Sequence, residues 1–410
     1  MRVYFFNRLA GYLVGSPEQG ITFTYDAAYV EAGGLPISLS LPLRVEPFTQ
    51  RECLPYFEGL LPDGDLRKAV ADHLHVSDRS TLKLLEILGK ECAGTVSVVA
   101  DEESGEMFDR HGRPGYRPIS ETEIADMIRN RPFRPMIHGD DEIRLSLAGA
   151  QDKIALALID GGWYLPLNGA PSTHIVKPSR DVDLYKTIAA NEFVCTKLAS
   201  VCGLNVPECC LSEFAGFPAF VAKRYDRNMQ VGESRSIVRL HQEDVCQALG
   251  IRPDNKYEAD GGPSITSIVH LLQRCCSQPI LDIQQFIKSV IFNFMIGNCD
   301  AHGKNYSLLE NDGRVQLAPL YDLACTMMYP ALTCKLSMKV GRHYDLRKVD
   351  WEDFLQMGAL CGIGAKAMRK MRDALAADVM QGFSTLERDP FCAEVALSIR
   401  KIAETQIARL

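Results

Sequence analysis

The segment from Ile280 to Ile296 constrains the fold of this chain more than any other part of the sequence. Apolar residues recur in it with helical period, at positions 283, 286, 287, 290, 291, 294 and 295. This spacing predicts a helix with one buried stripe. The pattern stops at Gly297, and the polar stretch from Cys299 to Asn305 is expected to form a loop. We therefore predict a core helix with a polar loop at its C-terminal end.

A short hairpin is predicted directly after this loop. Strands are expected at 306–309 and 315–320, with Asn311-Asp312-Gly313 as the turn, and Tyr321-Asp322 follows the second strand. In kinases a catalytic aspartate and a metal-binding asparagine lie five residues apart, and a second metal-binding aspartate follows. Asp300 and Asn305 have this separation, and Asp322 comes 17 residues after Asn305.

An amide oxygen and a carboxylate suit Mg²⁺, so Asn305 and Asp322 are the candidate metal ligands and Asp300 the candidate base. A lone Asp–Asn pair is more simply a helix-end residue and a strand-start residue. The buried helix before the pair and the hairpin with Asp322 after it favour phosphoryl transfer. His302 is left with two interpretations, a histidine that fixes the loop or one that contacts phosphate.

The part of the chain before residue 226 is rich in expected strands. They lie at 3–6, 21–25, 154–158, 163–167, 173–177, 209–214 and 219–223, with helices expected at 66–74, 80–89 and 184–202. From about residue 226 we expect mainly helices, including 351–410. The charged, Gly- and Pro-containing stretch 101–118 is expected to be a loop or domain boundary.

Lys177 ends one of these strands, where a kinase needs a cation for the nucleotide phosphates. Glu192, on the next helix, is a candidate partner for it. The plainer interpretations are a lysine that extends from the surface into solvent and an exposed helix-face charge.

Two further segments are candidates for nucleotide contacts, although each is weak as a motif. The first comprises Ala148, Gly149, Ala150, Gln151, Asp152 and Lys153, whose small residues would let backbone N–H groups approach phosphates. The second comprises Lys223, Arg224 and Tyr225, where main-chain groups would bind adenine. An ordinary turn and an ordinary strand end are the alternatives.

Composition narrows the possible functions. The chain has 410 residues and a formal net charge of −7, which argues against a dedicated nucleic-acid binder. Its 14 cysteines show no CxxC or Cys/His ligand spacing, so we expect free, mostly buried thiols in a reducing cytoplasm rather than a zinc site. No signal peptide is recognised, and no stretch reaches the ~18 uninterrupted apolar residues of a membrane helix.

Taken together in chain order, the motifs resemble those of the HipA family of serine/threonine kinase toxins. The resemblance is carried by SLAGAQDK (146–153), THIVK (173–177), KRYDR (223–227), RLHQED (239–244), DAHGKN (300–305) and Tyr321-Asp322. It implies an α+β fold with a two-lobed, protein-kinase-like core behind a small mixed α/β accessory domain. The corresponding domains would be 1–110, 111–225 and 226–410.

The resemblance also implies an ATP- and Mg²⁺-dependent protein kinase that acts as the toxin of a toxin–antitoxin pair. Asp300 would be the catalytic aspartate, assisted by Lys177 and His302, with Asn305 and Asp322 on the metal. The nucleotide would contact 148–153, Lys177, 223–225, His302, Asn305, Tyr321 and Asp322. Ser146 matches the serine whose autophosphorylation switches such kinases off, because a dianion there repels ATP phosphates.

Partners follow from the same resemblance. A helix-turn-helix antitoxin similar to HipB would neutralise the enzyme, and DNA would be reached through that complex. Lys366, Arg369 and Lys370 could contact DNA phosphates, although a solvated helix face is the simpler interpretation. Two other functions stay open, a small-molecule or lipid-like kinase and a catalytically idle corepressor that binds the antitoxin.

Overall fold

The computed structural model describes residues 1–16, 20–101, 115–129, 153–179, 186–230 and 236–410. Contacts among residues divide the chain into two compact units. The first holds 1–177, 214–217 and 223–254, and the second holds 178–213, 218–222 and 255–410. The domain boundaries predicted near residues 110 and 225 remain predictions.

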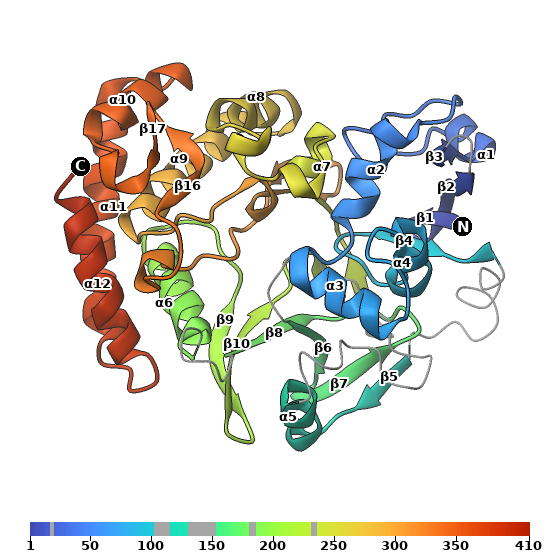
Figure 1. The fold of residues 1–410 in the computed structure, drawn as a ribbon, viewed down its shortest axis with the longest axis horizontal. Helices are drawn as coiled ribbons and strands as arrows, with labels where there is room; N and C mark the ends of the chain where they lie inside the picture. The colour runs from blue at the N-terminus through green and yellow to red at the C-terminus, as the bar shows by residue number, and fades with distance from the viewer. Residues whose placement is uncertain (17–19, 102–114, 130–152, 180–185, 231–235) are drawn as a thin grey trace. The chain divides into compact units, whose positions relative to one another are not determined.

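The N-terminal part of the first unit is an antiparallel four-stranded sheet with helices, drawn in blue in Figure 1. Its strand order is β3-β2-β1-β4, and its core includes the fully buried Phe5, Phe23 and Phe57. The strands and helices expected here are confirmed. The elements are β1 (Arg2–Phe5), β2 (Arg8–Ser16), β3 (Gly20–Tyr25), β4 (Val96–Val99), α1 (Ala27–Glu31), α2 (Gln50–Gly59), α3 (Gly64–His73) and α4 (Thr81–Leu88).

Strand β2 and helix α2 were not predicted, and each contains a residue that hides its pattern. Strand β2 contains Gly11, where a Cβ atom would lie 2.3 Å from the Thr24 carbonyl oxygen, so that only glycine allows this close approach. Helix α2 contains Pro55, a residue that usually ends helices. A capping box formed by Thr49 and Glu52 supplies hydrogen-bond partners for backbone N–H groups at the start of α2.

A six-stranded sheet follows, with the order β5-β7-β6-β8-β10-β9. Asp160 and Gly161, between β6 and β7, have φ values of 51° and 80°, as the type I′ turn of a tight hairpin requires. This confirms the predicted hairpin. The elements are β5 (Gly115–Pro118), β6 (Ile154–Ile159), β7 (Gly162–Leu167), β8 (His174–Pro178), β9 (Cys209–Phe214), β10 (Phe217–Lys223), α5 (Glu121–Arg129) and α6 (Ile188–Val201).

Two expectations about organisation are wrong. Residues 115–118, expected to be part of a loop, form β5, which pairs with β7 through Tyr116 and Pro166. The helical region begins later than residue 226, because short strands that carry few apolar residues come first. These elements are β11 (Arg227–Gln230), β12 (Ser236–Arg239), β13 (His241–Asp244) and then α7 (Val245–Leu249).

The second unit is mainly helical. The predicted core helix is α9 (Pro279–Met295), which packs against α8, α11 and α12, and its Phe286, Ile291 and Met295 are fully buried. Figure 1 shows α10, α11 and α12 in orange to red. The other elements are α8 (Ile265–Cys275), β14 (Ser307–Asn311), β15 (Arg314–Leu317), β16 (Lys335–Val340), β17 (His343–Asp345), α10 (Trp351–Leu360), α11 (Ala365–Leu386) and α12 (Ala393–Ile407).

All fourteen cysteines are free and nine of them are buried, as the sequence predicted. Among the described residues, no helix is both long enough and apolar enough to cross a membrane.

A buried ionic network lies within the first unit. Glu91 accepts hydrogen bonds from Arg224 at 3.2 Å and from Arg227 at 3.0 Å, and Asp226 accepts from both arginines at 2.7–2.9 Å. These four side chains are at most 4% exposed. Burial alone would raise the pKa of Glu91, but the neighbouring guanidinium groups outweigh it and lower that pKa.

We predict that Glu91→Gln lowers the free energy of unfolding by about 3–5 kcal/mol, because it removes a charge that two buried arginines need. Urea denaturation followed by circular dichroism measures this loss. Glu86→Gln is the matched control, because Glu86 pairs with Lys83 on an exposed face of α4. Equal denaturation midpoints for the two variants would contradict the structural role of the network.

Candidate catalytic loop

The loop after α9 is held by side chains at the end of that helix. Gly297 has a φ of +72°, and a Cβ atom there would lie 2.9 Å from Ile402, so glycine ends the helix. Asn298 donates to the Asn293 side chain at 3.0 Å, and its own carbonyl Oδ1 accepts from the backbone N–H of Asp300 at 3.0 Å. The backbone of Asp300 therefore has a fixed place relative to α9.

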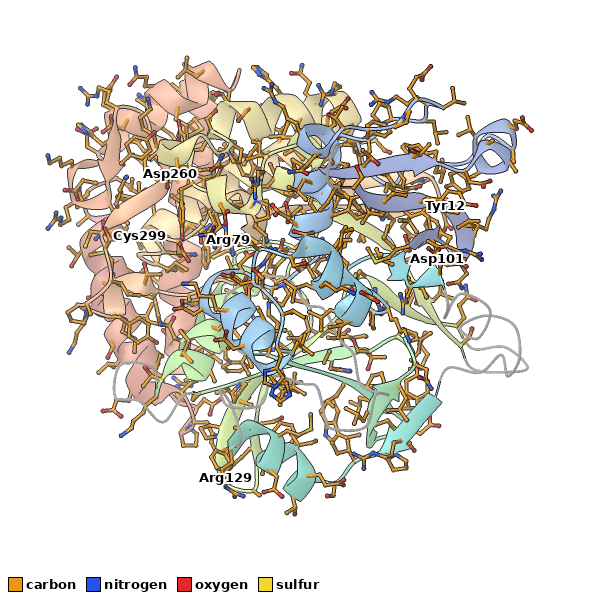
Figure 2. All side chains as sticks on the ribbon, turned by 45° about the vertical axis from the view of Figure 1, so that its right-hand side comes forward. Tyr12, Arg79, Asp101, Arg129, Asp260 and Cys299 are labelled. Atoms are coloured by element: carbon orange, nitrogen blue, oxygen red, sulfur yellow. The ribbon has the colours of Figure 1, made fainter. Side chains whose placement is uncertain are left out.

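Cys299, labelled in Figure 2, continues the same anchoring. Its backbone N–H donates to Thr326 Oγ1 at 2.8 Å, and its carbonyl oxygen accepts from the backbone N–H and the hydroxyl of Ser337, each at 2.9 Å. The loop is thus tied to the segment after Asp322 and to β16.

The carboxylate of Asp300 receives a hydrogen bond that the sequence did not predict. The hydroxyl of Tyr257 donates to Asp300 Oδ1 at 2.9 Å. The side chain of Asp300 reaches solvent, but the surrounding protein displaces part of its water and raises the pKa of the carboxyl group. The Tyr257 hydrogen bond and the charge of Lys256 act in the opposite direction, and the charge of Asp322 adds to the rise.

His302 is buried, which favours the neutral form of its imidazole. Desolvation, together with the charges of Lys256 and Lys304, lowers the pKa of its imidazole well below the usual value. Its ring meets Tyr257 edge to face at 5.3 Å, and its Nδ1 has no hydrogen-bond partner among the described residues. Its backbone N–H donates to the Asp300 carbonyl and to Asn305 Oδ1, at 2.8 and 3.1 Å. The backbone of His302 therefore helps to fix the loop, and the phosphate contact of its ring remains a prediction.

The two candidate metal ligands lie side by side. Asn305 Nδ2 donates to Asp322 Oδ2 at 3.2 Å. Asp322 has a φ of +55°, a left-handed conformation that non-glycine residues adopt mainly where the surroundings impose it. Tyr321, beside it, donates its hydroxyl to the Lys304 carbonyl at 2.7 Å and thereby joins the hairpin end to the loop. One amide and one carboxylate are a donor set that fits Mg²⁺.

Asn191, on α6, clamps the segment that follows Asp322. Its Nδ2 donates to the carbonyl oxygen of Cys325 at 3.0 Å, and its Oδ1 accepts from the backbone N–H of Cys325 at 2.7 Å. It is fully buried, and its amide also reaches the Tyr329 hydroxyl at 3.2 Å. The only sequence signal for this role is a polar residue inside a buried helix.

Replacing Asn191 by alanine is predicted to lower the free energy of unfolding by about 1–3 kcal/mol, because the buried N–H and C=O of Cys325 lose their partners. Thermal or chemical denaturation measures the change. Asn228→Ala, at an exposed position of β11, is the control and should leave stability unchanged. If Asn191→Ala were as stable as the control, the clamp would have no structural role.

The other residues predicted to contact the nucleotide, and the candidate partner Glu192, differ in burial and in their contacts. Lys177, at the end of β8, is 5% exposed, and Glu192, on α6, is 3% exposed, so the surface interpretations of both are wrong. Buried charges of this kind are normally paired. The side chain of Arg224 belongs to the ionic network, and its backbone N–H donates to the Thr173 carbonyl oxygen at 2.8 Å.

Lys223 is exposed, and Tyr225 donates its hydroxyl to Gln242. Lys153 is half-buried. Ser146, Ala148, Gly149, Ala150, Gln151 and Asp152 lie outside the described residues. The structure therefore brings together Asp300, His302, Asn305, Tyr321 and Asp322 within the second unit, whereas Lys153, Lys177 and 223–225 belong to the first.

Comparison with known proteins identifies the family. Residues 145–383 match the family model described as HipA-like C-terminal domain, and residues 1–99 match the HipA N-terminal domain. The chain belongs to the HipA family. The two matches follow each other along the chain in the order that the sequence motifs predicted.

Two relatives extend over most of the chain. The protein Y4mE of Sinorhizobium fredii is 36% identical over 375 residues, which cover 90% of this chain and 87% of Y4mE. The serine/threonine-protein kinase toxin HipA of Shewanella oneidensis is 30% identical over 326 residues, which cover 77% of this chain and 72% of the relative. The predicted enzyme class, a serine/threonine protein kinase, is confirmed.

A solved structure also matches. It is that of the Shewanella oneidensis MR-1 toxin–antitoxin system HipA, HipB and its operator DNA complex. The match covers 100% of this chain and 96% of the solved chain, with a TM-score of 0.81 and 24% sequence identity. This likeness confirms the predicted α+β, kinase-like fold.

Proposed function

We propose that this HipA-family kinase transfers the γ-phosphoryl group of Mg²⁺-bound ATP to a serine or threonine hydroxyl. The observation that carries the proposal is the arrangement of Asp300, Asn305 and Asp322 at one end of α9 and its hairpin. When bound, Mg²⁺ would neutralise the charge that develops on the transferred phosphoryl group. Asn305 and Asp322 would hold the metal through their side-chain oxygens.

Asp300 is assigned the role of the base. Its carboxylate would accept the proton of the substrate hydroxyl while the hydroxyl oxygen forms the new bond to phosphorus and ADP leaves. The hydrogen bond from its backbone N–H to Asn298 Oδ1 fixes the backbone that carries this carboxylate, so little backbone reorganisation is needed. The raised pKa of Asp300 makes its carboxylate a stronger base, which favours proton transfer near neutral pH.

We assign the remaining nucleotide contacts to the residues that the sequence singled out. Lys177 and the loop 148–153 would bind phosphates, and backbone groups of 223–225 would bind adenine. The side chain and the backbone N–H of Arg224 already have partners, so its contribution would be limited to its carbonyl oxygen. His302 and Tyr321 would line the site beside the metal ligands.

Asp300→Ala and Asp322→Ala are each predicted to lower kcat about 100-fold or more, because one removes the base and the other a metal ligand. Phosphate transfer from γ-labelled ATP to protein measures the loss. Asp260→Asn is the control, since Asp260 is an exposed aspartate of the same unit, labelled in Figure 2. Equal label in the wild type and in both alanine variants would refute the assignment.

We also propose that the kinase autophosphorylates Ser146 and then loses ATP affinity. A phosphate beside the loop 148–153 would repel the phosphates of ATP. After prolonged incubation with ATP, peptide mass spectrometry should find phosphate on Ser146, and Ser146→Ala should keep its activity for longer than the wild type. Unmodified Ser146 in an active preparation would exclude this form of regulation.

A toxin–antitoxin role completes the proposal. The solved relative was studied together with HipB and operator DNA, and we propose that this chain likewise has a helix-turn-helix antitoxin as partner in the cytoplasm. Any contact with DNA would then arise within that complex, in keeping with the net charge of −7.

A further inference from the structure

The segment that carries Tyr257 reaches the candidate base from a distant part of the sequence. Tyr257 precedes a short 3-10 helix, η3 (Glu258–Asp260), and lies 43 residues before Asp300. Its hydroxyl donates to Asp300 Oδ1 at 2.9 Å, and its ring packs edge to face on His302. One side chain therefore contacts two of the residues predicted to act in the reaction.

This segment is fixed on both sides of Tyr257. The carbonyl oxygen of Lys256 accepts a hydrogen bond from the backbone N–H of Gly303 at 3.2 Å. The carboxylate of Glu258 accepts one from the backbone N–H of Lys339, in β16, at 2.6 Å. Because its neighbours are anchored to the loop and to β16, Tyr257 offers its hydroxyl from a preset position.

We propose that Tyr257 is a positioning residue for the Asp300 carboxylate. Its hydroxyl donates a hydrogen bond to Oδ1 and thereby fixes the rotation of the carboxylate. Oδ2 is then left to accept the substrate proton. The proposal rests on the assignment of Asp300 as the base. A charge-assisted hydrogen bond of this kind is stronger than a neutral one, and small errors in the placement of a catalytic group reduce rates steeply.

The charges around Asp300 act with this hydrogen bond. The ammonium group of Lys256 lies 5.5 Å from the centre of the Tyr257 ring, and its charge favours the ionised carboxylate. Asp322, from the segment after β15, disfavours ionisation, and His302, in the same loop, is neutral. Removal of the Tyr257 hydroxyl should therefore raise the pKa of Asp300 and move the acidic limb of the rate profile to higher pH.

Tyr257→Phe tests the proposal, because it removes one oxygen atom and keeps the ring on His302. We expect kcat to fall about 10-fold while KM for ATP stays within about twofold, with the acidic limb of kcat shifted upward. Tyr12→Phe is the matched control: Tyr12, labelled in Figure 2, also donates its hydroxyl to an aspartate, Asp26, at 3.2 Å. The control should keep the wild-type kcat and pH profile.

An unchanged kcat in Tyr257→Phe, or an equal loss in Tyr12→Phe, would overturn the proposal. Wild-type protein without any transferase activity would instead refute the proposed function, so the two failures are distinguishable.

A second measurement keeps the Tyr257 hydroxyl and therefore does not depend on whether the Tyr257→Phe variant folds. With 3-fluorotyrosine at position 257, the ¹⁹F resonance should titrate with the acidic limb of the rate profile, and Asp300→Asn should abolish this titration. A resonance that is insensitive to pH, or one that still titrates in Asp300→Asn, would show that the hydrogen bond to Asp300 is absent.

Discussion

The candidate catalytic loop depends on the hydrogen bonds that continue from the last turn of α9. The buried face of α9 fixes the helix, and Asn293 near its end holds Asn298, which in turn holds the backbone of Asp300. Asn293 also donates to the Tyr306 hydroxyl at 3.2 Å, just before β14. The backbone of Asp300, the proposed base, and the start of the hairpin therefore take their positions from one buried amide.

Different contacts hold the part of the site that carries the proposed metal ligands Asn305 and Asp322. The Tyr321 hydroxyl donates to the Lys304 carbonyl oxygen and so joins the hairpin end to the loop. Asn191 forms two hydrogen bonds with the backbone of Cys325, which follows Asp322. Asp322 is thus anchored through Tyr321 before it and Cys325 after it. These anchors explain why Asp322 keeps a left-handed backbone conformation.

In the first unit, the Glu91 network has a comparable organising role. Glu91 lies within residues 1–99, which match the HipA N-terminal domain, whereas Arg224 and Arg227 lie within the match to the C-terminal domain. Because buried arginines are costly without a counter-charge, the two matched parts are energetically dependent on each other. The segment that includes the proposed adenine contacts, 223–225, is therefore held by a residue outside the match to the C-terminal domain.

Local sequence patterns were sufficient for α9, its loop and its hairpin, because these elements are continuous in the chain; α8, β16 and β17 were not predicted. They predicted that Asp300, Asn305 and Asp322 would be close together. They could not reveal Tyr257 or Asn191, because neither belongs to a local motif. Tyr257 reaches the loop, and Asn191 reaches the segment after Asp322, from distant parts of the chain. The Glu91 network was missed for the same reason, and β5 and β11–β13 carry too few apolar residues to stand out.

The most direct test of the central claim is to locate the metal. A crystal structure with a non-hydrolysable ATP analogue and Mn²⁺, whose anomalous scattering marks its position, would show which side chains bind it. We predict a manganese ion coordinated by the side-chain oxygens of Asn305 and Asp322, with Asp300 free of the metal. Manganese bound to the nucleotide but away from both Asn305 and Asp322 would contradict it.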